Sequence, residues 1–185
     1  SNIEGYIYRS LDITDYKEVN KILNEESPDV VINTAAMTNV DLCEDENKAC
    51  EALNVHAVSY LADACLSCDA HLIHISTDFI FDGEDGPYKE DDKPNPLSYY
   101  GLSKLKSEEI LYNHNVRWTI LRTIIVFGVG ENLSKSNIVL WAKEALEKGE
   151  QLNIIDDQYR APTLAEDLAQ ACILAAKKKT YGIFH

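Results

Sequence analysis

Three side chains in the middle of the sequence carry the functional groups of a proton-transfer site. Thr77 lies just after the apolar run 72–75, and Tyr100 and Lys104 follow four positions apart. If a helix begins near Tyr100, this spacing puts the phenol and the ammonium on one helix face. A hydroxyl, a phenol and an ammonium at the end of a buried strand could protonate a substrate oxygen. Taken alone, Tyr100 and Lys104 could equally be a solvated pair on a helix surface, so the surrounding chain has to decide.

Elements that could hold these groups alternate along the chain. Short β-branched or apolar runs predict strands, and longer segments with apolar residues at helical spacing predict helices. We expect strands at 6–9, 30–32, 72–75, 118–121, 152–155 and 182–185, and helices between Asp15 and Pro28 and at 46–68, 100–113, 138–148 and 164–178. This alternation indicates a parallel α/β sheet, which binds ligands at the carboxyl ends of its strands. The polar segments 34–38, 76–78 and 122–125 all follow predicted strands, so we expect one shared site.

The composition argues against some classes of protein. With 185 residues the chain can bury a sizeable core. The net charge of −14, from 17 basic and 31 acidic residues, argues against a surface that binds nucleic acid. No apolar run approaches the ~20 residues that span a bilayer, and no signal peptide opens the sequence, so no membrane association is expected.

The cysteines and histidines show no spacing typical of a metal site. Cys65 and Cys68 form a CxxC pair, but the second pair that a zinc site needs is missing. We interpret the five cysteines as reduced thiols, which favours a cytoplasmic protein. His56, His74 and His114 are expected to be structural, and no metal ligand is predicted.

A glycine-rich turn such as GxGxxG, which usually opens a nucleotide-binding α/β domain, does not occur. The first 35 residues contain one glycine, Gly5, and both ends of the chain lie beside predicted strands. We therefore expect this sequence to be the middle of a longer protein, without the half of the site that grips the phosphates of a cofactor.

Six segments of the sequence resemble the extended short-chain dehydrogenase/reductase family, and within it the dTDP-4-dehydrorhamnose reductases. They are LDITD (11–15), DVVINTAAMTNVDLCE (29–44), HISTDFIFDG (74–83), YYGLSKLKSE (99–108), LRTIIVFG (121–128) and DDQYRAPTLAEDLA (156–169). The resemblance implies a Rossmann-like, doubly wound parallel sheet that lacks its first βα unit. It also implies an NAD(P)-binding domain over 1–128, followed by a mixed region over 129–185 that contributes to the substrate-binding lobe and the sheet edge.

The same resemblance implies that NADPH or NADH reduces the 4-keto group of a nucleotide-linked deoxysugar, most directly dTDP-4-dehydro-L-rhamnose to dTDP-L-rhamnose. Tyr100 would protonate the sugar oxygen, and Thr77 would hydrogen-bond that oxygen. Lys104 would lower the pKa of Tyr100, since a nearby ammonium favours the phenolate, and would hold the nicotinamide ribose.

Further positions match residues that line the family's site. The cofactor set comprises Asp12, Ile13, Ala35, Ala36, Thr38 and Asn54, together with Tyr100 and Lys104. The substrate set comprises Val40, Thr77, Asp78, Phe79, Ile125 and Arg160. Ile125 stands where these reductases often carry a tryptophan near the sugar, so the sugar itself stays open. The sequence does not separate NADH from NADPH, and a homodimer remains a possible assembly.

Three other interpretations remain open. The chain could be a nucleotide-sugar epimerase or dehydratase of the same superfamily, although the Ser76-Thr77-Asp78-Phe79 segment fits a reductase better. It could resemble the non-catalytic regulatory subunit of methionine adenosyltransferase, which also binds NADP. It could also be a fragment without activity of its own.

Overall fold

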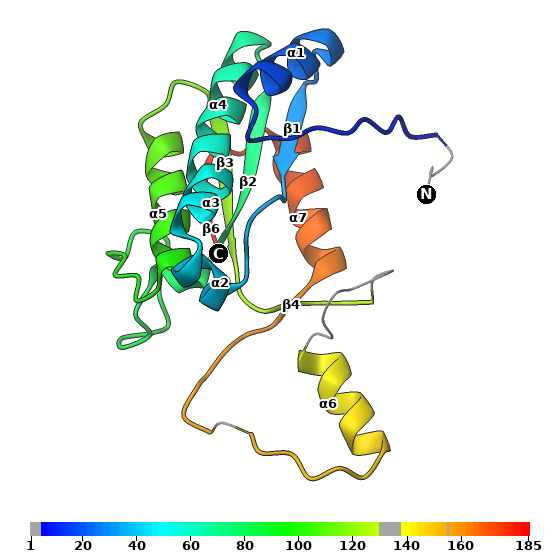
Figure 1. The fold of residues 1–185 in the computed structure, drawn as a ribbon, viewed down its shortest axis with the longest axis vertical. Coiled ribbons are helices and arrows are strands. Elements are labelled where there is room, and N and C mark those ends of the chain that lie inside the picture. The colour runs from blue at the N-terminus through cyan, green and yellow to red at the C-terminus, as the bar shows by residue number, and fades with distance from the viewer. Residues whose placement is uncertain (1–4, 130–137, 155) are drawn as a thin grey trace.

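A four-stranded parallel sheet forms the centre of the computed structural model, which describes residues 5–129, 138–154 and 156–185 (Figure 1). The strands β1 (Val30–Asn33), β2 (His71–Thr77), β3 (Arg117–Thr123) and β6 (Gly182–Phe184) are ordered β1-β2-β3-β6. All three strand pairs are parallel, so the carboxyl ends of the strands meet at one edge. The strands predicted near 30, 72, 118 and 182 are confirmed.

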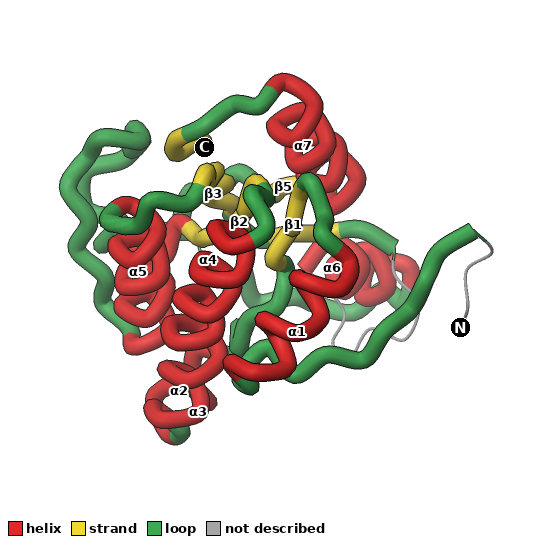
Figure 2. Tube along the Cα trace, turned by 90° about the horizontal axis from the view of Figure 1, so that it is seen from above, coloured by secondary structure: helices red, strands yellow, loops and turns green. Residues whose placement is uncertain are grey.

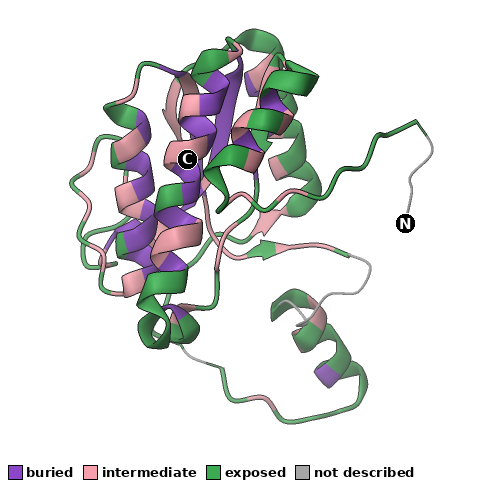
Figure 3. Ribbon diagram, turned by 45° about the horizontal axis from the view of Figure 1, so that its top comes forward, coloured by how far each residue is buried: buried purple, intermediate pink, exposed green. Residues whose placement is uncertain are grey.

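Helices cover both faces of this sheet (Figure 2). The helices α1 (Tyr16–Glu26), α4 (Ala57–Ser67) and α5 (Tyr99–Tyr112) pack on one face, and α7 (Ala165–Lys178) packs on the other. Each face has its own core: Val19, Leu61 and Leu111 meet Leu72 on one side, while Cys172 and Ala175 meet Ile73 on the other. The buried residues accordingly lie between the sheet and its helices (Figure 3). This arrangement confirms the Rossmann-like, doubly wound α/β class.

Short elements complete the chain. They are α2 (Val40–Asp45), α3 (Asn47–Glu51), the π-helix η1 (Ala52–His56), the 3₁₀ turn η2 (Asp78–Ile80), β4 (Val126–Phe127), α6 (Ile138–Glu147) and β5 (Thr163–Leu164). β4 and β5 pair in parallel as a separate two-stranded sheet. In Figure 1, α6 stands away from the central sheet. None of the helices in the described ranges is long and apolar enough to cross a membrane.

Two predicted strands are absent. Residues 6–9 form irregular backbone, and the side chains of Tyr6, Ile7 and Tyr8 are exposed. Residues 152–154 are also irregular, whereas Ile155 lies outside the described residues. Both predictions were wrong because a strand needs a hydrogen-bonded neighbour, and neither segment pairs with a strand in the described part of the chain.

The helix predicted over 46–68 forms over residues 47–67, but its middle turn is π-helical. It runs as α3, then the π-turn η1, then α4, and Asn54 lies inside the π-turn. A π-turn admits one extra residue per turn, which frequently marks a functional position. The short helix α2 was not predicted, although Asn39 caps it by accepting a hydrogen bond from the backbone N–H of Leu42 at 3.2 Å.

Candidate active site

Thr77 ends β2 at the carboxyl edge of the sheet and is 5% exposed. Its Oγ1 accepts a hydrogen bond from the backbone N–H of Phe79 at 3.2 Å and donates to Asp78 Oδ1 at 3.2 Å. Thr77 therefore caps η2 and fixes the positions of Asp78 and Phe79, the next two predicted site residues.

Gly101 allows helix α5 to begin directly against η2. A Cβ atom at this position would overlap the carbonyl oxygen of Phe79 and would lie 3.1 Å from Pro96 Cβ. The ring of Phe79 contacts the ring of Tyr100 edge to face, with centroids 5.7 Å apart. Gly101 was not among the predicted site residues, although glycine inside a helix is unfavourable and indicates close approach of another segment when it occurs.

Tyr100 is 9% exposed and packs with Cys43 and Cys50, beside Met37 and Val40. Burial raises the pKa of its phenol, and hydrogen bonding with Thr77 acts in the opposite direction. We expected Lys104 to lower this pKa, but the structure does not bear that out, because the amine of Lys104 is directed at other groups. A phenol with a raised pKa stays protonated at neutral pH and can donate its proton.

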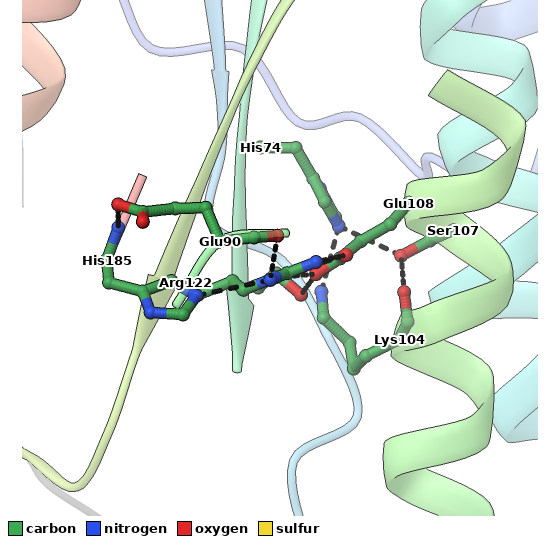
Figure 4. Close-up of polar contacts among 8 residues, drawn as sticks. His74, Glu90, Lys104, Ser107, Glu108, Arg122 and His185 are labelled. Atoms are coloured by element: carbon green, nitrogen blue, oxygen red, sulfur yellow. Dashed lines mark hydrogen bonds and ion pairs between the residues drawn. The ribbon is translucent and has the colours of Figure 1, made fainter. Parts of the chain in front are cut away.

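The amine of Lys104 is buried, with the residue 2% exposed, and points toward β2 (Figure 4). Its Nζ donates to the carbonyl oxygen of Ile75 at 2.8 Å and lies 3.0 Å from His74 Nε2. Burial lowers the pKa of Lys104 to about 8, and the carboxylate of Glu108, one turn further along α5, acts in the opposite direction. Lys104 therefore titrates closer to neutral pH than an exposed lysine does.

A buried ion pair fixes the far half of α5 to the sheet (Figure 4). Arg122 on β3 holds Glu108 through Nη2–Oε2 at 2.8 Å and Nε–Oε1 at 3.1 Å, and Ser76 donates to the same carboxylate. Arg122 Nη1 also donates to the carbonyl oxygen of Glu90 at 3.1 Å and lies 3.1 Å from His185 Nε2. The ion pair thus connects the turn of α5 that follows Lys104 to β3.

Asn54 reaches from η1 to the segment that follows β1. Its Oδ1 accepts from the backbone N–H of Met37 at 2.8 Å, and its Nδ2 donates to the carbonyl oxygen of Met37 at 3.0 Å and to Ser103 Oγ at 2.9 Å. The oxygen and the nitrogen of the amide thus both bind other groups of the protein. Asn54 shapes the backbone between Ala36 and Thr38, and Ala35 at the start of this segment is exposed.

The predicted substrate residues meet beside η2. The guanidinium of Arg160 lies 5.2 Å from the centroid of the Phe79 ring, and its Nη1 lies 3.9 Å from Asp78 Oδ2. Burial raises the pKa of Asp78, while Arg160 and the Thr77 hydroxyl oppose this shift. Arg160 therefore adds a positive charge close to the catalytic candidates.

Ile125 adopts a left-handed backbone conformation with φ 36°, which is strained for a β-branched residue. The carbonyl oxygens of Ile124 and Ile125 accept from the backbone N–H of Thr163 at 3.1 and 3.2 Å. These bonds connect the end of β3 to the segment that follows Arg160.

Asp12 and Ile13 lie beside α1 rather than with this group. Asp12 Oδ1 accepts from both the backbone N–H and the hydroxyl of Thr14, which lowers the pKa of this exposed carboxyl. Ile13 packs against the core that α1 and α4 share. Of the cofactor set, the structure thus brings together the 35–38 segment, Asn54 and α5.

His74, which we expected to be structural, and Ser103 both contact candidate site residues, and neither was predicted to do so. Ser103 receives the Asn54 amide, and His74 lies between Asn33 and Lys104. Both are buried polar residues, which need partners, but only the tertiary fold shows which partners they have.

The chain matches one family model and several known proteins. The family model for the RmlD substrate binding domain matches residues 2–185. A dTDP-4-dehydrorhamnose reductase from Aggregatibacter actinomycetemcomitans is 37% identical over 186 residues, covering 96% of this chain and 62% of the relative. The methionine adenosyltransferase 2 subunit beta of Bos taurus is 32% identical over 183 residues, covering 96% of this chain and 55% of the relative.

A solved structure of a protein with the same name as the first relative also matches the chain. The dTDP-4-dehydrorhamnose reductase of Bacillus anthracis, in complex with NADP, matches with a TM-score of 0.87 and 30% identity, covering 95% of this chain and 61% of that one. The chain thus spans between 55% and 62% of the lengths of these three proteins.

Proposed function

The chain belongs to the family of the RmlD substrate binding domain, and we propose on that basis that it carries the catalytic part of an NAD(P)H-dependent reductase. The substrate is a nucleotide-linked deoxysugar with a 4-keto group, most directly dTDP-4-dehydro-L-rhamnose, and the product is dTDP-L-rhamnose. One observation carries the proposal: the Thr77 hydroxyl and the buried Tyr100 phenol interact at the carboxyl end of β2, one helical turn from the buried amine of Lys104.

The proposed proton transfer uses groups of this chain. Tyr100 gives its phenolic proton to the keto oxygen as that oxygen becomes a hydroxyl. The Thr77 hydroxyl turns from Asp78 Oδ1 and donates its hydrogen bond to the same oxygen. The raised pKa of Tyr100 keeps the proton available at neutral pH. Arg160, beside Asp78 and Phe79, would bind the diphosphate of the nucleotide sugar, since a guanidinium forms charge-assisted hydrogen bonds with phosphate oxygens.

The carboxyl edge of β1 is the surface that we assign to the nicotinamide nucleotide. Ala35 is exposed and Ala36 half-buried, so small side chains leave the backbone open to a flat ligand, and the amide of Asn54 holds that backbone in place. The bound NADPH or NADH would supply the hydride. Lys104 would hold its ribose, with Thr38 and the 35–36 segment beside it.

Turnover of the purified protein tests this function. Mixed with NADPH or NADH and dTDP-4-dehydro-L-rhamnose, it should consume the reduced nicotinamide and form dTDP-L-rhamnose in equal amounts. Binding of both ligands without any loss of nicotinamide absorbance would refute the proposal.

A second function is favoured by one comparison. The methionine adenosyltransferase 2 subunit beta is 32% identical over nearly the same residues, so the chain could instead serve as a non-catalytic subunit of a methionine adenosyltransferase. Stable association with such an enzyme, together with absence of ketosugar turnover, would favour this alternative. Ketosugar turnover without such association would favour the reductase.

A further inference from the structure

Asn33 fixes the position of the ring proton of His74. Asn33 Oδ1 accepts from the backbone N–H of Ala35 at 3.1 Å, so the amide nitrogen is the atom that faces the histidine. Nδ2 lies 3.2 Å from His74 Nδ1. An amide NH₂ group can only donate, so Nδ1 accepts, and the proton of the neutral imidazole lies on Nε2. Burial, followed by the charge of Lys104, holds the pKa of His74 well below its usual range, which keeps the ring neutral.

The Nε2–H group faces two atoms of α5 (Figure 4). Ser107 Oγ lies 3.1 Å from Nε2, and Lys104 Nζ lies 3.0 Å from it. Ser107 gives its own proton to the carbonyl oxygen of Lys104 at 2.6 Å, so its oxygen is free to accept from Nε2–H. Toward Lys104, His74 therefore presents a donor. An ammonium gains no hydrogen bond from a donor, whereas a neutral amine can accept one.

We propose that His74 is a positioning residue for Lys104: locked by Asn33 as the Nε2–H tautomer, it confines the amine to the Ile75 carbonyl and favours its neutral form. Other groups facing Lys104 act differently. Glu108 and Cys50 favour the protonated amine, and Arg122, the nearby cation on β3, is paired with Glu108. The importance of this arrangement for turnover rests on the proposed function, but the protonation of Lys104 can be measured without substrate.

Nuclear magnetic resonance of the purified protein gives the direct test. With ¹⁵N-labelled histidine, the ring of His74 should show a protonated Nε2 and an unprotonated Nδ1 across neutral pH. A protonated Nδ1 in the natural protein would overturn the proposal. The Lys104 side-chain signals, followed against pH, give the midpoint at which the amine loses its proton.

Two substitutions should move this midpoint in opposite directions. Asn33→Asp offers only acceptors to Nδ1, so the ring proton should move there, Nε2 should accept from the Lys104 ammonium, and the midpoint should rise by about one pH unit or more. Ser107→Ala leaves Nζ as the remaining acceptor for Nε2–H, so the midpoint should fall. The charge introduced by Asn33→Asp cannot explain a fall in Ser107→Ala, which adds no charge.

A midpoint that stays unchanged in Ser107→Ala, or an Asn33→Asp variant in which the tautomer reverses without a rise, would contradict the proposal. His71→Gln is the matched control, because His71 is a second buried histidine on β2 that pairs with Thr119 instead. It should leave the Lys104 midpoint in place. If the midpoints move as expected but no ketosugar is reduced, the positioning role stands and the proposed reaction fails.

Discussion

The side-chain amide of Asn54 binds both backbone polar groups of Met37, accepting from its N–H at 2.8 Å and donating to its carbonyl oxygen at 3.0 Å. Asn54, in a π-turn, thus supplies the two backbone hydrogen bonds that a neighbouring strand would otherwise supply beyond the end of β1. It holds the segment proposed to line the cofactor.

Replacing Asn54 with leucine should loosen that segment. Two partly buried backbone groups would lose their partner, at a cost of about 1–3 kcal/mol in the free energy of unfolding. The Michaelis constant for the nicotinamide nucleotide should rise about tenfold, corresponding to ~1.4 kcal/mol of lost binding. Steady-state kinetics and denaturant unfolding measure both effects. Asn24→Leu is the control, since Asn24 is exposed and its amide donates to the carbonyl oxygen of Asn20 within α1. An equal effect there would contradict the prediction.

Tyr100 and Tyr99 form a matched pair for testing the proton donor. Tyr100→Phe should lower kcat by about 10²–10⁴-fold, the usual contribution of a positioned acid, while nucleotide binding persists. Tyr99→Phe removes a phenol that donates to Glu51 at 3.4 Å, and it should retain most activity. Rates measured at saturating substrate separate the two variants, and similar losses in both would argue against Tyr100 as the donor.

Gly101→Ala should separate α5 from η2. The added methyl group would overlap the Phe79 carbonyl, so the helix or the turn must shift, at a cost of about 1–3 kcal/mol in the free energy of unfolding. The same shift would move Tyr100 relative to Thr77 and lower kcat. Leu102→Ala, at the next and more exposed position of α5, gives the comparison. Thermal unfolding and kcat should both show a larger loss for Gly101→Ala.

Because of Lys104, the free energy of unfolding should change with pH in the alkaline range. Its pKa is about 8 in the folded protein, against an unfolded value of 10.5. Between these values the unfolded chain binds more protons at this site, so raising the pH stabilises the fold, by up to about 3 kcal/mol across the whole window. Below pH 8 both states are protonated and this contribution no longer changes.

The measurement is the difference in unfolding free energy between the natural protein and Lys104→Met as the pH rises. Taking the difference cancels groups common to both proteins, such as the buried thiols of Cys43 and Cys65, whose pKa values burial raises to about 12. The difference should shift in favour of the natural protein above pH 8. A difference that stays constant up to pH 10 would mean that the amine is not destabilised by burial.

Local patterns in the sequence predicted the sheet and most of its helices. The runs at 30–32 and 72–75 are β-branched or apolar and buried, and the spacing of Tyr100 and Lys104 on α5 follows from the helical repeat. Strand 6–9 failed because strand formation depends on a neighbour that the local sequence does not specify. Periodicity cannot show a π-turn either, since the interruption at Asn54 depends on Met37, seventeen positions away.

The site was predicted in part for the same reason. Thr77, Asp78, Phe79 and Tyr100 adjoin one another because a strand end and a helix start lie close in the fold. The direction of the Lys104 amine was not predictable, since it depends on His74 and the Ile75 carbonyl, which lie 30 and 29 positions away in the chain. The i, i+4 spacing fixed the face of the helix but not the partner of the charge.

The Arg122–Glu108 pair should determine which segments unfold together. Through Arg122 it connects β3, α5, the backbone at Glu90 and the C-terminal His185, which are far apart in the chain. These segments should therefore exchange their amide hydrogens as one cooperative unit. Removing one partner of a buried pair costs about 3–5 kcal/mol, so Arg122→Met should reduce protection in β3 and the second half of α5 together. Hydrogen exchange that slows or quickens in only one of these segments would show that they open independently.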